Sequence, residues 1–275
     1  MPAESADRLY RCPRVMGIVN VTPDSFSDGG LYLDPQTAIA HGLAMVADGA
    51  DILDIGGEST RPGAKPVAVE DEIARVIPVI KGLAGCGVPL SIDTRHARVM
   101  AAALDEGATM VNDITALAGD PDSMTLMAGR NATICLMHMQ GTPETMQHDP
   151  SYNDVIADVM GFLAGRIAKC VDAGIARDRL MIDLGIGFGK SPAHNLSLLR
   201  HLAQFRDLGV PVLVGLSRKR FIDAVCPGTE SGDRLPGSLA GALWCAAQGA
   251  DVIRVHDVAE TVQALAVTAA IRNAS

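Results

Sequence analysis

The sequence predicts a single-domain (β/α)8 barrel, the α/β fold known as a TIM barrel, over residues 1–275. Three observations predict it: eight short apolar runs, helical periodicity between them, and a polar residue at or near the end of each run. Runs that are apolar almost throughout are typical of parallel strands that helices cover on the outside. The length of 275 residues also suits this fold, which commonly takes about 250.

The eight runs have the length and the β-branched content of strands. They cover residues 15–21, 51–57, 89–94, 110–114, 133–139, 180–186, 211–217 and 251–256. Between the runs, apolar residues recur at the spacing of a helix. Before the second run they are Ile39, Leu43, Val46 and Ala50, before the third Ile73, Val76, Ile77 and Ile80, and after the last run Val258, Val262, Leu265 and Thr268 continue the pattern. A strand followed by a helix, repeated, indicates a parallel sheet. A doubly wound open sheet is the alternative, because a pattern can miscount elements.

Polar residues stand at the predicted C-terminal strand ends. They are Asn20, Asp54, Asp93, Asn112, His138, Asp183, Ser217 and His256. In a barrel these ends converge on one mouth, where the active sites of this fold lie. Each residue taken singly could simply hydrogen-bond its own loop, but eight together predict a site. The long polar loops at 22–34 and 57–66 are expected to close over a substrate there.

The composition excludes several classes of partner. The net charge of −9 would repel nucleic acid and anionic membrane surfaces. No apolar stretch reaches the roughly 18 residues of a membrane span, and the N-terminal segment lacks an apolar signal core. We therefore expect a cytoplasmic protein that acts on small molecules.

The six cysteines show no C-x-x-C pair and no zinc-site spacing. Cys135 and Cys245 lie in apolar runs and are expected to be buried free thiols. A metal, if one is bound, would be a hard cation held by oxygen ligands and substrate phosphates, and Mg²⁺ fits that description.

Several motifs together carry a resemblance to a known family. They are NVTPDSFSDGG (20–30), DIGGESTRPGA (54–64), SIDT (91–94), NDI (112–114), LMHMQGTP (136–143), DLGIGFGK (183–190), GLSRKRF (215–221) and IRVH (253–256). In content and order they resemble the dihydropteroate synthase family, from about Val15 to Ile271. The resemblance implies a transferase of folate biosynthesis that joins 6-hydroxymethyl-7,8-dihydropterin pyrophosphate to p-aminobenzoate and releases 7,8-dihydropteroate and pyrophosphate in an SN1-like displacement.

The resemblance also implies the pterin site. A dihydropterin presents amino and ring N–H donors, for which carboxylates are natural acceptors. The family pattern assigns pterin binding to Asp93, Asn112, Met137, Asp183, Phe188, Gly215 and Lys219. Asp93 taken alone could instead cap a helix that begins before Arg95.

Pyrophosphate needs positive charge and hydrogen-bond donors near its departing oxygens. The resemblance assigns this work to Asn20, Arg61, Arg254 and His256, with Mg²⁺ at Asn20. It makes Asp93, Lys219, Arg254 and His256 the catalytic residues. Without the resemblance, Arg254 could equally be a strand-end partner of Asp251 or Asp257.

The family pocket for p-aminobenzoate, where sulfonamides compete, corresponds to Thr60, Arg61, Pro62, Phe188, Lys219 and Arg220. Its aromatic ring would lie between Pro62 and Phe188, and its carboxylate near the start of the helix after Ser217. Arg220 departs from the family, in which a serine often stands at this position. A serine hydroxyl contact is therefore not carried over.

Two other functions stay open at this stage. Lys219, flanked by Arg218 and Arg220, could be a Schiff-base lysine of an aldolase with a lowered pKa. The barrel could also be a pterin-binding module or an inactive paralogue, although such relatives need neither the STRPG loop nor the SRK segment. GIGFG (185–189) lacks the full spacing of a dinucleotide-binding motif. The family resemblance further implies a homodimer, for which the segments 239–247 and 258–271 offer a surface.

Overall fold

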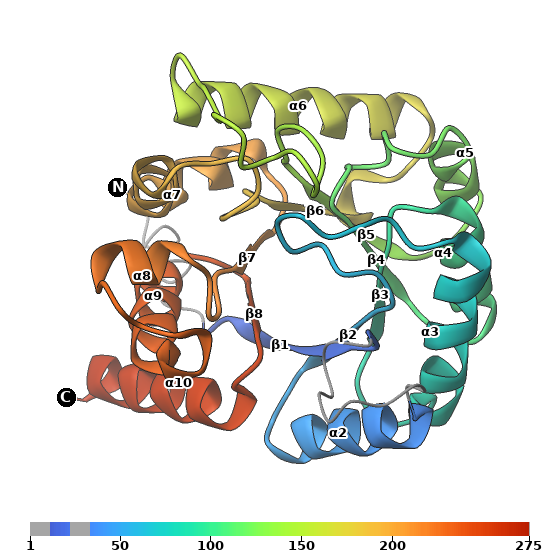
Figure 1. Cartoon of the computed structure of the whole chain (residues 1–275), viewed down its shortest axis with the longest axis horizontal. Helices are drawn as coiled ribbons and strands as arrows, with labels where there is room; N and C mark the ends of the chain where they lie inside the picture. The colour runs from blue at the N-terminus through green and yellow to red at the C-terminus, as the bar shows by residue number, and fades with distance from the viewer. Residues whose placement is uncertain (1–11, 23–33, 275) are drawn as a thin grey trace.

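The computed structural model describes residues 12–22 and 34–274. Eight parallel strands close into a barrel in sequence order (Figure 1). They are β1 (Arg14–Asn20), β2 (Ile52–Gly56), β3 (Leu90–Asp93), β4 (Met110–Asp113), β5 (Thr133–Met137), β6 (Leu180–Asp183), β7 (Val212–Gly215) and β8 (Val252–Val255). The predicted (β/α)8 barrel is confirmed. The open-sheet alternative is wrong, because β8 pairs directly with β1, with Met16 beside Arg254.

Each strand is followed by helix, and Figure 1 shows these helices arranged around the outside of the barrel. They are α2 (Pro35–Ala47), α3 (Val69–Leu83), α4 (Ala97–Asp105), α5 (Ser123–Ala128), α6 (Val155–Asp172), α7 (Pro192–Arg200), α8 (Phe221–Val225), α9 (Leu235–Ala247) and α10 (Val258–Asn273), with 3-10 turns η3 (Arg177–Arg179), η4 (Leu202–Leu208) and η5 (Ser231–Asp233). Three helices begin where a side chain accepts hydrogen bonds from first-turn N–H groups: Asp34, Asp154 and Ser191.

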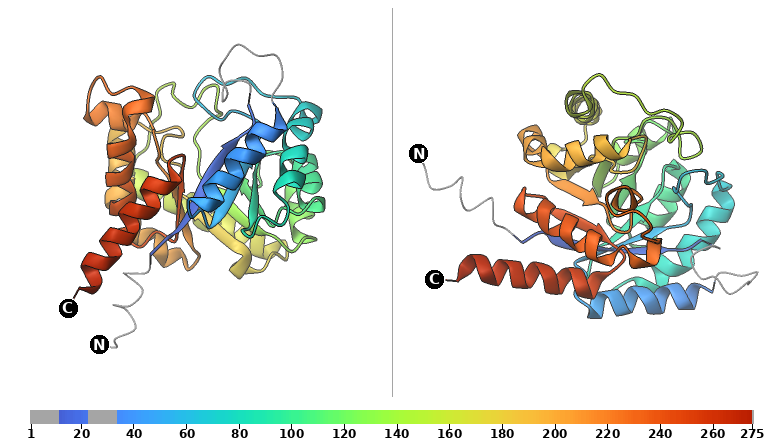
Figure 2. Two further views of the ribbon diagram at one scale, coloured as in Figure 1. Left: turned by 90° about the horizontal axis from the view of Figure 1, so that it is seen from below. Right: turned by 60° about the vertical axis from the view of Figure 1, so that its left-hand side comes forward.

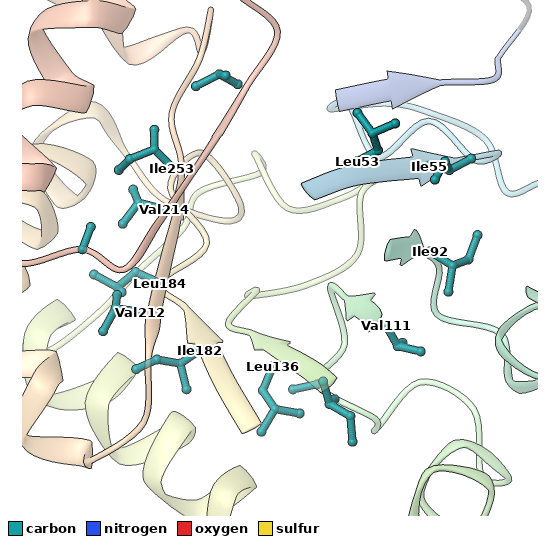
Figure 3. Close-up of a cluster of buried hydrophobic side chains, with 14 of the residues drawn as sticks. Leu53, Ile55, Ile92, Val111, Leu136, Ile182, Leu184, Val212, Val214 and Ile253 are labelled. Atoms are coloured by element: carbon teal, nitrogen blue, oxygen red, sulfur yellow. The ribbon is translucent and has the colours of Figure 1, made fainter. Parts of the chain in front are cut away.

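Two apolar layers hold the barrel. The larger one lies between strands and helices, and Figure 3 shows some of its side chains, among them Leu53, Ile92 and Val214. The smaller one fills the barrel interior with Met16, Ile52, Met110, Cys135, Met181, Leu213 and Val252. We call this second cluster the barrel floor.

The strand period of two places the polar residues directly above the floor. On six strands, the residue two positions after the floor residue therefore points to the same side of the strand, one level higher in the barrel. These residues are Asp54, Asn112, Met137, Asp183, Gly215 and Arg254. Asp93 joins them, because it pairs in register with Asn112. The loops after β2, β5 and β7 lie at this same end, away from the C-terminal end of α10 (Figure 2).

Of the four residues noted at helical spacing in this region, Ala50 is buried and Ile39 and Val46 pack against the core, whereas Leu43 lies on the outer side of α2. Leu43 is 46% exposed, whereas Ala38, Gly42 and Met45 are buried. The α3 helix packs so closely on α2 that a Cβ on Gly42 would stand 3.0 Å from two atoms of Leu83. The inner face of α2 thus combines two small residues, Ala38 and Gly42, with Met45 and the partly buried Ile39 and Val46.

All six cysteines are free, and Cys135 and Cys245 are buried as predicted. Over residues 12–22 and 34–274, none of the helices has the length and apolar composition needed to cross a membrane.

Leu53→Ala and Leu43→Ala form a matched pair that tests this assignment of the core. We expect Leu53→Ala to lower the free energy of unfolding by about 2–5 kcal/mol, because it leaves a cavity between β2 and the helices. We expect Leu43→Ala to change it by less than about 0.5 kcal/mol, because its side chain already contacts water. Urea denaturation measures both, and equal losses would contradict the assignment.

Candidate functional site

One arginine joins the acidic residues above the barrel floor. Arg254 donates from Nε to Asp54 Oδ2 at 2.5 Å and from Nη2 to Asp93 Oδ2 at 2.7 Å. Asn112 Nδ2 donates to the same Asp54 oxygen at 3.0 Å. We call Asp54, Asp93, Asn112 and Arg254 the polar layer.

Neither single-residue alternative for this layer holds. Arg254 does not pair with Asp251 or Asp257 but reaches across the barrel interior to β2 and β3. Asp257 instead pairs with Arg218. Asp93 does not cap a helix, since α4 has its N-cap at His96.

The polar layer shifts the pKa values of its own members. Burial raises the pKa of Asp93 to about 7, although the charge of Arg254 opposes the rise. For Arg254, burial acts to lower the pKa, but the carboxylates of Asp54 and Asp93 outweigh it and raise the pKa. The guanidinium therefore stays charged, and the interior holds a fixed cation surrounded by carboxyl groups.

Asp183 and Lys219 form a second group beside this layer. Asp183 Oδ1 accepts from the Gly185 N–H at 2.8 Å, and burial raises its pKa against the charge of Lys219. Lys219 Nζ lies 4.7 Å from the centroid of the Phe188 ring and donates to the Ile186 carbonyl. The ring, the ammonium and the carboxylate thus face one part of the mouth.

The pKa of Lys219 is lowered, as the aldolase alternative requires, but not by the flanking arginines. Burial lowers the pKa to about 8, Asp183 opposes this, and Arg254 contributes to it. Arg218 is neutralised by Asp257, and Arg220 is exposed. The flanking arginines are therefore not the source of the shift.

His256 lies just beyond the end of β8. Its Nδ1 lies 3.0 Å from Ser217 Oγ, which also accepts from the His256 backbone N–H at 3.2 Å. Burial, followed by the charges of Arg254 and Arg218, lowers the pKa of His256 to about 3. The ring is therefore neutral near pH 7.

Residues of the 57–66 loop stand at the rim. Thr60 is half-buried, while Arg61 and Pro62 are exposed. The Gly63 N–H donates to the Pro143 carbonyl at 3.0 Å, which joins this loop to the loop after β5. Positive charge on Arg61 contributes to the lowered pKa of His256, so the loop is close enough to act on the mouth electrostatically. Most of the other predicted closing loop, residues 23–33, lies outside the described residues.

The chain matches the model of the pterin binding enzyme family over residues 16–256. It is 49% identical to the dihydropteroate synthase of Neisseria meningitidis serogroup B over 265 residues, which cover 94% of this chain and 93% of that one. It is 48% identical to the dihydropteroate synthase of Escherichia coli K12 over 263 residues, covering 95% and 93%. The chain belongs to the dihydropteroate synthase family.

Several solved structures of the family have nearly the same fold as this chain over almost its whole length. A Xanthomonas albilineans dihydropteroate synthase with 4-aminobenzoic acid has a TM-score of 0.90 at 51% identity, covering 97% of this chain and 95% of that one. The same organism's enzyme in complex with 7,8-dihydropteroate has a TM-score of 0.86 at 47% identity, covering 97% and 96%. A Yersinia pestis enzyme with a sulfonamide drug has a TM-score of 0.91 at 46% identity, covering 97% and 96%.

The structure brings most of the predicted family residues to the mouth. Asp93, Asn112, Met137, Asp183, Gly215 and Arg254 lie in the interior, Phe188, Lys219 and His256 lie just above it, and Asn20 ends β1. Thr60, Arg61, Pro62 and Arg220 lie at the rim. A Cβ on Gly215 would stand 3.9 Å from Lys219 Nζ, so this glycine lies between the interior and the rim groups.

Sequence reasoning missed two residues of the site, Glu58 and Lys190, and the partner of a third, Asp54. Asp54 was noted as a strand-end residue, but its pairing with Arg254 joins strands too far apart in sequence for any motif to reveal. Glu58 accepts from the Val67 N–H at 2.9 Å and from Arg95 Nε at 2.9 Å, which closes the base of the 57–66 loop. Lys190, at the end of the DLGIGFGK motif, is only 2% exposed.

Replacing His256 should change how stability depends on pH. The pKa of His256 in the folded protein is about 3, below the ordinary value of 6.5, so the unfolded chain binds an extra proton between these values. His256 should therefore lower the free energy of unfolding of the wild type as the pH falls below 6.5, because protonation then favours the unfolded chain. His256→Asn removes that contribution, and denaturation at pH 7.5 and pH 5 should show a smaller loss in the variant. An identical loss would mean that His256 is protonated in the folded state.

Proposed function

We infer that this chain is a dihydropteroate synthase, a transferase that condenses 6-hydroxymethyl-7,8-dihydropterin pyrophosphate with p-aminobenzoate. The observation that carries this inference is the interior polar layer, present in a chain 49% identical to a dihydropteroate synthase over nearly its whole length. The residue roles that follow belong to the proposal.

The pterin would lie on the polar layer. Asp183 would accept from its amino and ring N–H groups, and Lys219 would donate to its acceptor atoms. Within the described part of the chain, Asn112 Oδ1 is buried and accepts no hydrogen bond, so a pterin N–H would satisfy it. Met137, buried at the end of β5, would supply an apolar contact to the ring.

Pyrophosphate would leave before the amine attacks. Its C–O bond breaks with the electron pair going to pyrophosphate, and the methylene carbon is left cationic. The carboxyl groups of Asp93 and Asp183 favour that positive charge. Asn20, Arg61, Arg254 and the neutral His256 would hold the departing oxygens, and closure of the rim loops would exclude water.

The amine of p-aminobenzoate then donates its lone pair to the methylene carbon and releases a proton. Its ring would pack between Phe188 and Pro62, beside Thr60 and Arg61. Lys219 and the exposed Arg220 would attract its carboxylate. An aryl amine is neutral near pH 7, which is why no Ser–His–Asp triad is required.

Mg²⁺ is part of the proposal as well. In the residues that the structure describes, no three His, Cys, Asp or Glu side chains are grouped to hold a metal ion. A single neutral ligand such as Asn20 fits a Mg²⁺ ion that takes its other ligands from pyrophosphate and water. The ion would neutralise charge on the leaving group.

The homodimer and the cytoplasmic location also stay proposals. Trp244, Val267 and Ile271 on α9 and α10 are 48%, 55% and 70% exposed, which leaves apolar side chains for a second copy of the chain to cover. The cytoplasm is where we expect these substrates to be made and used.

The activity is tested by pyrophosphate release from the pterin substrate with Mg²⁺, with and without p-aminobenzoate, and by the mass of the product. Stoichiometric, aminobenzoate-dependent release is the expected result. Saturable pterin binding without product would instead indicate a pterin-binding module or an inactive paralogue. Borohydride trapping of a carbonyl compound on Lys219 would indicate an aldolase.

Asp183→Ala should abolish pterin binding, because it removes the carboxylate that accepts from the pterin edge. Calorimetric titration with 6-hydroxymethyl-7,8-dihydropterin measures the affinity. The control is Asp178→Ala. Asp178 is exposed and lies just before the N-terminal end of β6, away from the site, so this variant should bind the pterin as the wild type does. Near-normal affinity in Asp183→Ala would refute the assignment.

Arg61→Ala should reduce turnover more than pterin affinity, because Arg61 stands on the rim and not in the interior. The expected loss in kcat/KM is about tenfold to a hundredfold. Lys65→Ala, an exposed cation on the same loop, is the control and should leave turnover nearly unchanged. Equal losses in turnover and in pterin affinity would contradict this placement.

A further inference from the structure

The turn at residues 185–189 is held by side chains along its whole length. Its five successive carbonyl groups each accept a hydrogen bond: Gly185 and Phe188 from Lys190 Nζ at 2.9 Å, Ile186 from Lys219 Nζ, Gly187 from Gln147 Nε2 at 2.8 Å, and Gly189 from Tyr152 Oη at 2.7 Å. Loop carbonyls ordinarily bond to water or to other backbone groups. This turn is therefore fixed in place by side-chain donors, two of the five bonds coming from the lysine that follows it and three from Gln147, Tyr152 and Lys219.

Lys190 supplies two of these five hydrogen bonds from a fully buried position. Its ammonium also lies 2.9 Å from His138 Nδ1 and 3.2 Å from the His138 carbonyl. A lysine is almost never fully buried unless its charge has partners, because an unpaired charge there is costly. The ammonium thus joins both ends of the turn to the end of β5.

The contact with His138 requires a particular state of that ring. Burial lowers the pKa of Lys190 to about 7, although the charge of Asp183 opposes the fall. When the amine of Lys190 is protonated it has only donors, so Nδ1 of His138 is then the acceptor. Burial and the charge of Lys190 lower the pKa of His138 to about 3, in agreement with this.

The turn approaches the β5 end too closely for side chains to hold it by packing. A Cβ on Gly185 would stand 1.9 Å from the His138 carbonyl oxygen, and one on Gly189 would stand 2.4 Å from that of Gln140. Both glycines have positive φ, 66° and 63°. Backbone lies directly on backbone here, so polar contacts hold the turn, and Lys190 makes two of the five side-chain contacts to its carbonyl groups.

We propose that Lys190 is a positioning residue for the amine substrate, because it holds the Phe188 carbonyl and so fixes the Phe188 ring at the aminobenzoate pocket. This inference rests on the proposed function. Asp183 belongs to β6, whose backbone is paired within the barrel, although its carboxylate also accepts from the Gly185 N–H, whereas Phe188 belongs to the turn alone. Loss of the ammonium should therefore affect the amine far more than the pterin.

Lys190→Met tests this, since it keeps the length and apolar stem of the side chain and removes the ammonium. We expect the KM for p-aminobenzoate and the Kd for sulfanilamide to rise about tenfold or more, because a small misplacement of a positioning group has effects of that size. The Kd for the dihydropterin should change less than about threefold. Lys190→Gln, which keeps two donors, should fall between Lys190→Met and the wild type.

Tyr152→Phe is the matched control on the same turn. It removes the single hydrogen bond to Gly189 and leaves both Lys190 contacts in place, so its KM for p-aminobenzoate should stay near that of the wild type. An equal rise in Tyr152→Phe would mean that any loosening of the turn has the same effect, and would overturn the assignment to Lys190.

The remaining outcomes separate this inference from the function on which it rests. A wild type without aminobenzoate-dependent pyrophosphate release defeats the proposed function itself. If the wild type is active, two results for Lys190→Met defeat only the role of Lys190. One is an unchanged KM for p-aminobenzoate, and the other is an equal loss of affinity for both substrates. If circular dichroism shows that Lys190→Met does not fold, Lys190→Gln takes its place. The change in its KM for p-aminobenzoate is then compared with the change in its Kd for the dihydropterin. Failure of both to fold would make Lys190 a requirement of the fold and overturn the proposal.

Discussion

The guanidinium of Arg254 is the group on which the site depends. Its side chain is 18% exposed, and it binds Asp54, which is fully buried, and Asp93, which is 13% exposed. Carboxylates placed this deep would be costly without a cation beside them. Because Asp54 also accepts from Asn112, one arginine on β8 orients side chains of β2, β3 and β4. Under the proposed function, a planar pterin would meet acceptors that are already in position.

The barrel interior makes this arrangement possible because it has two levels, the apolar barrel floor and the polar layer above it. The apolar floor supplies stability, and the residues two positions further along the same strands supply polarity. The rim is built differently, from loops that side chains hold: Glu58 closes the base of one loop, and Lys190 fixes the turn after β6. Under the proposed function, the interior groups would bind the pterin and the rim groups would bind the second substrate and close over both.

The fold could be predicted from the sequence because eight buried strands leave eight apolar runs, and their polar ends mark the mouth. The exposure of Leu43 could not be predicted, since it stands at the same helical spacing as Ile39 and Val46, which pack against the core, while the small residues Ala38 and Gly42 are buried. Nor could the partners of Arg254, since Asp54 lies 200 positions away and the contact exists only after closure of the barrel. The burial of Lys190 could not be predicted either, because it depends on acceptors from His138 and from the turn.

The most direct test of the account is a double-mutant cycle on the polar layer. Dihydropterin affinity is measured by calorimetry for the wild type, Asp54→Asn, Arg254→Gln and the double variant. If Arg254 acts by ordering the layer through Asp54, each single change should weaken binding, and the double change should weaken it little further. Losses in binding free energy that simply add would contradict the account, because the two residues would then contribute to pterin binding independently.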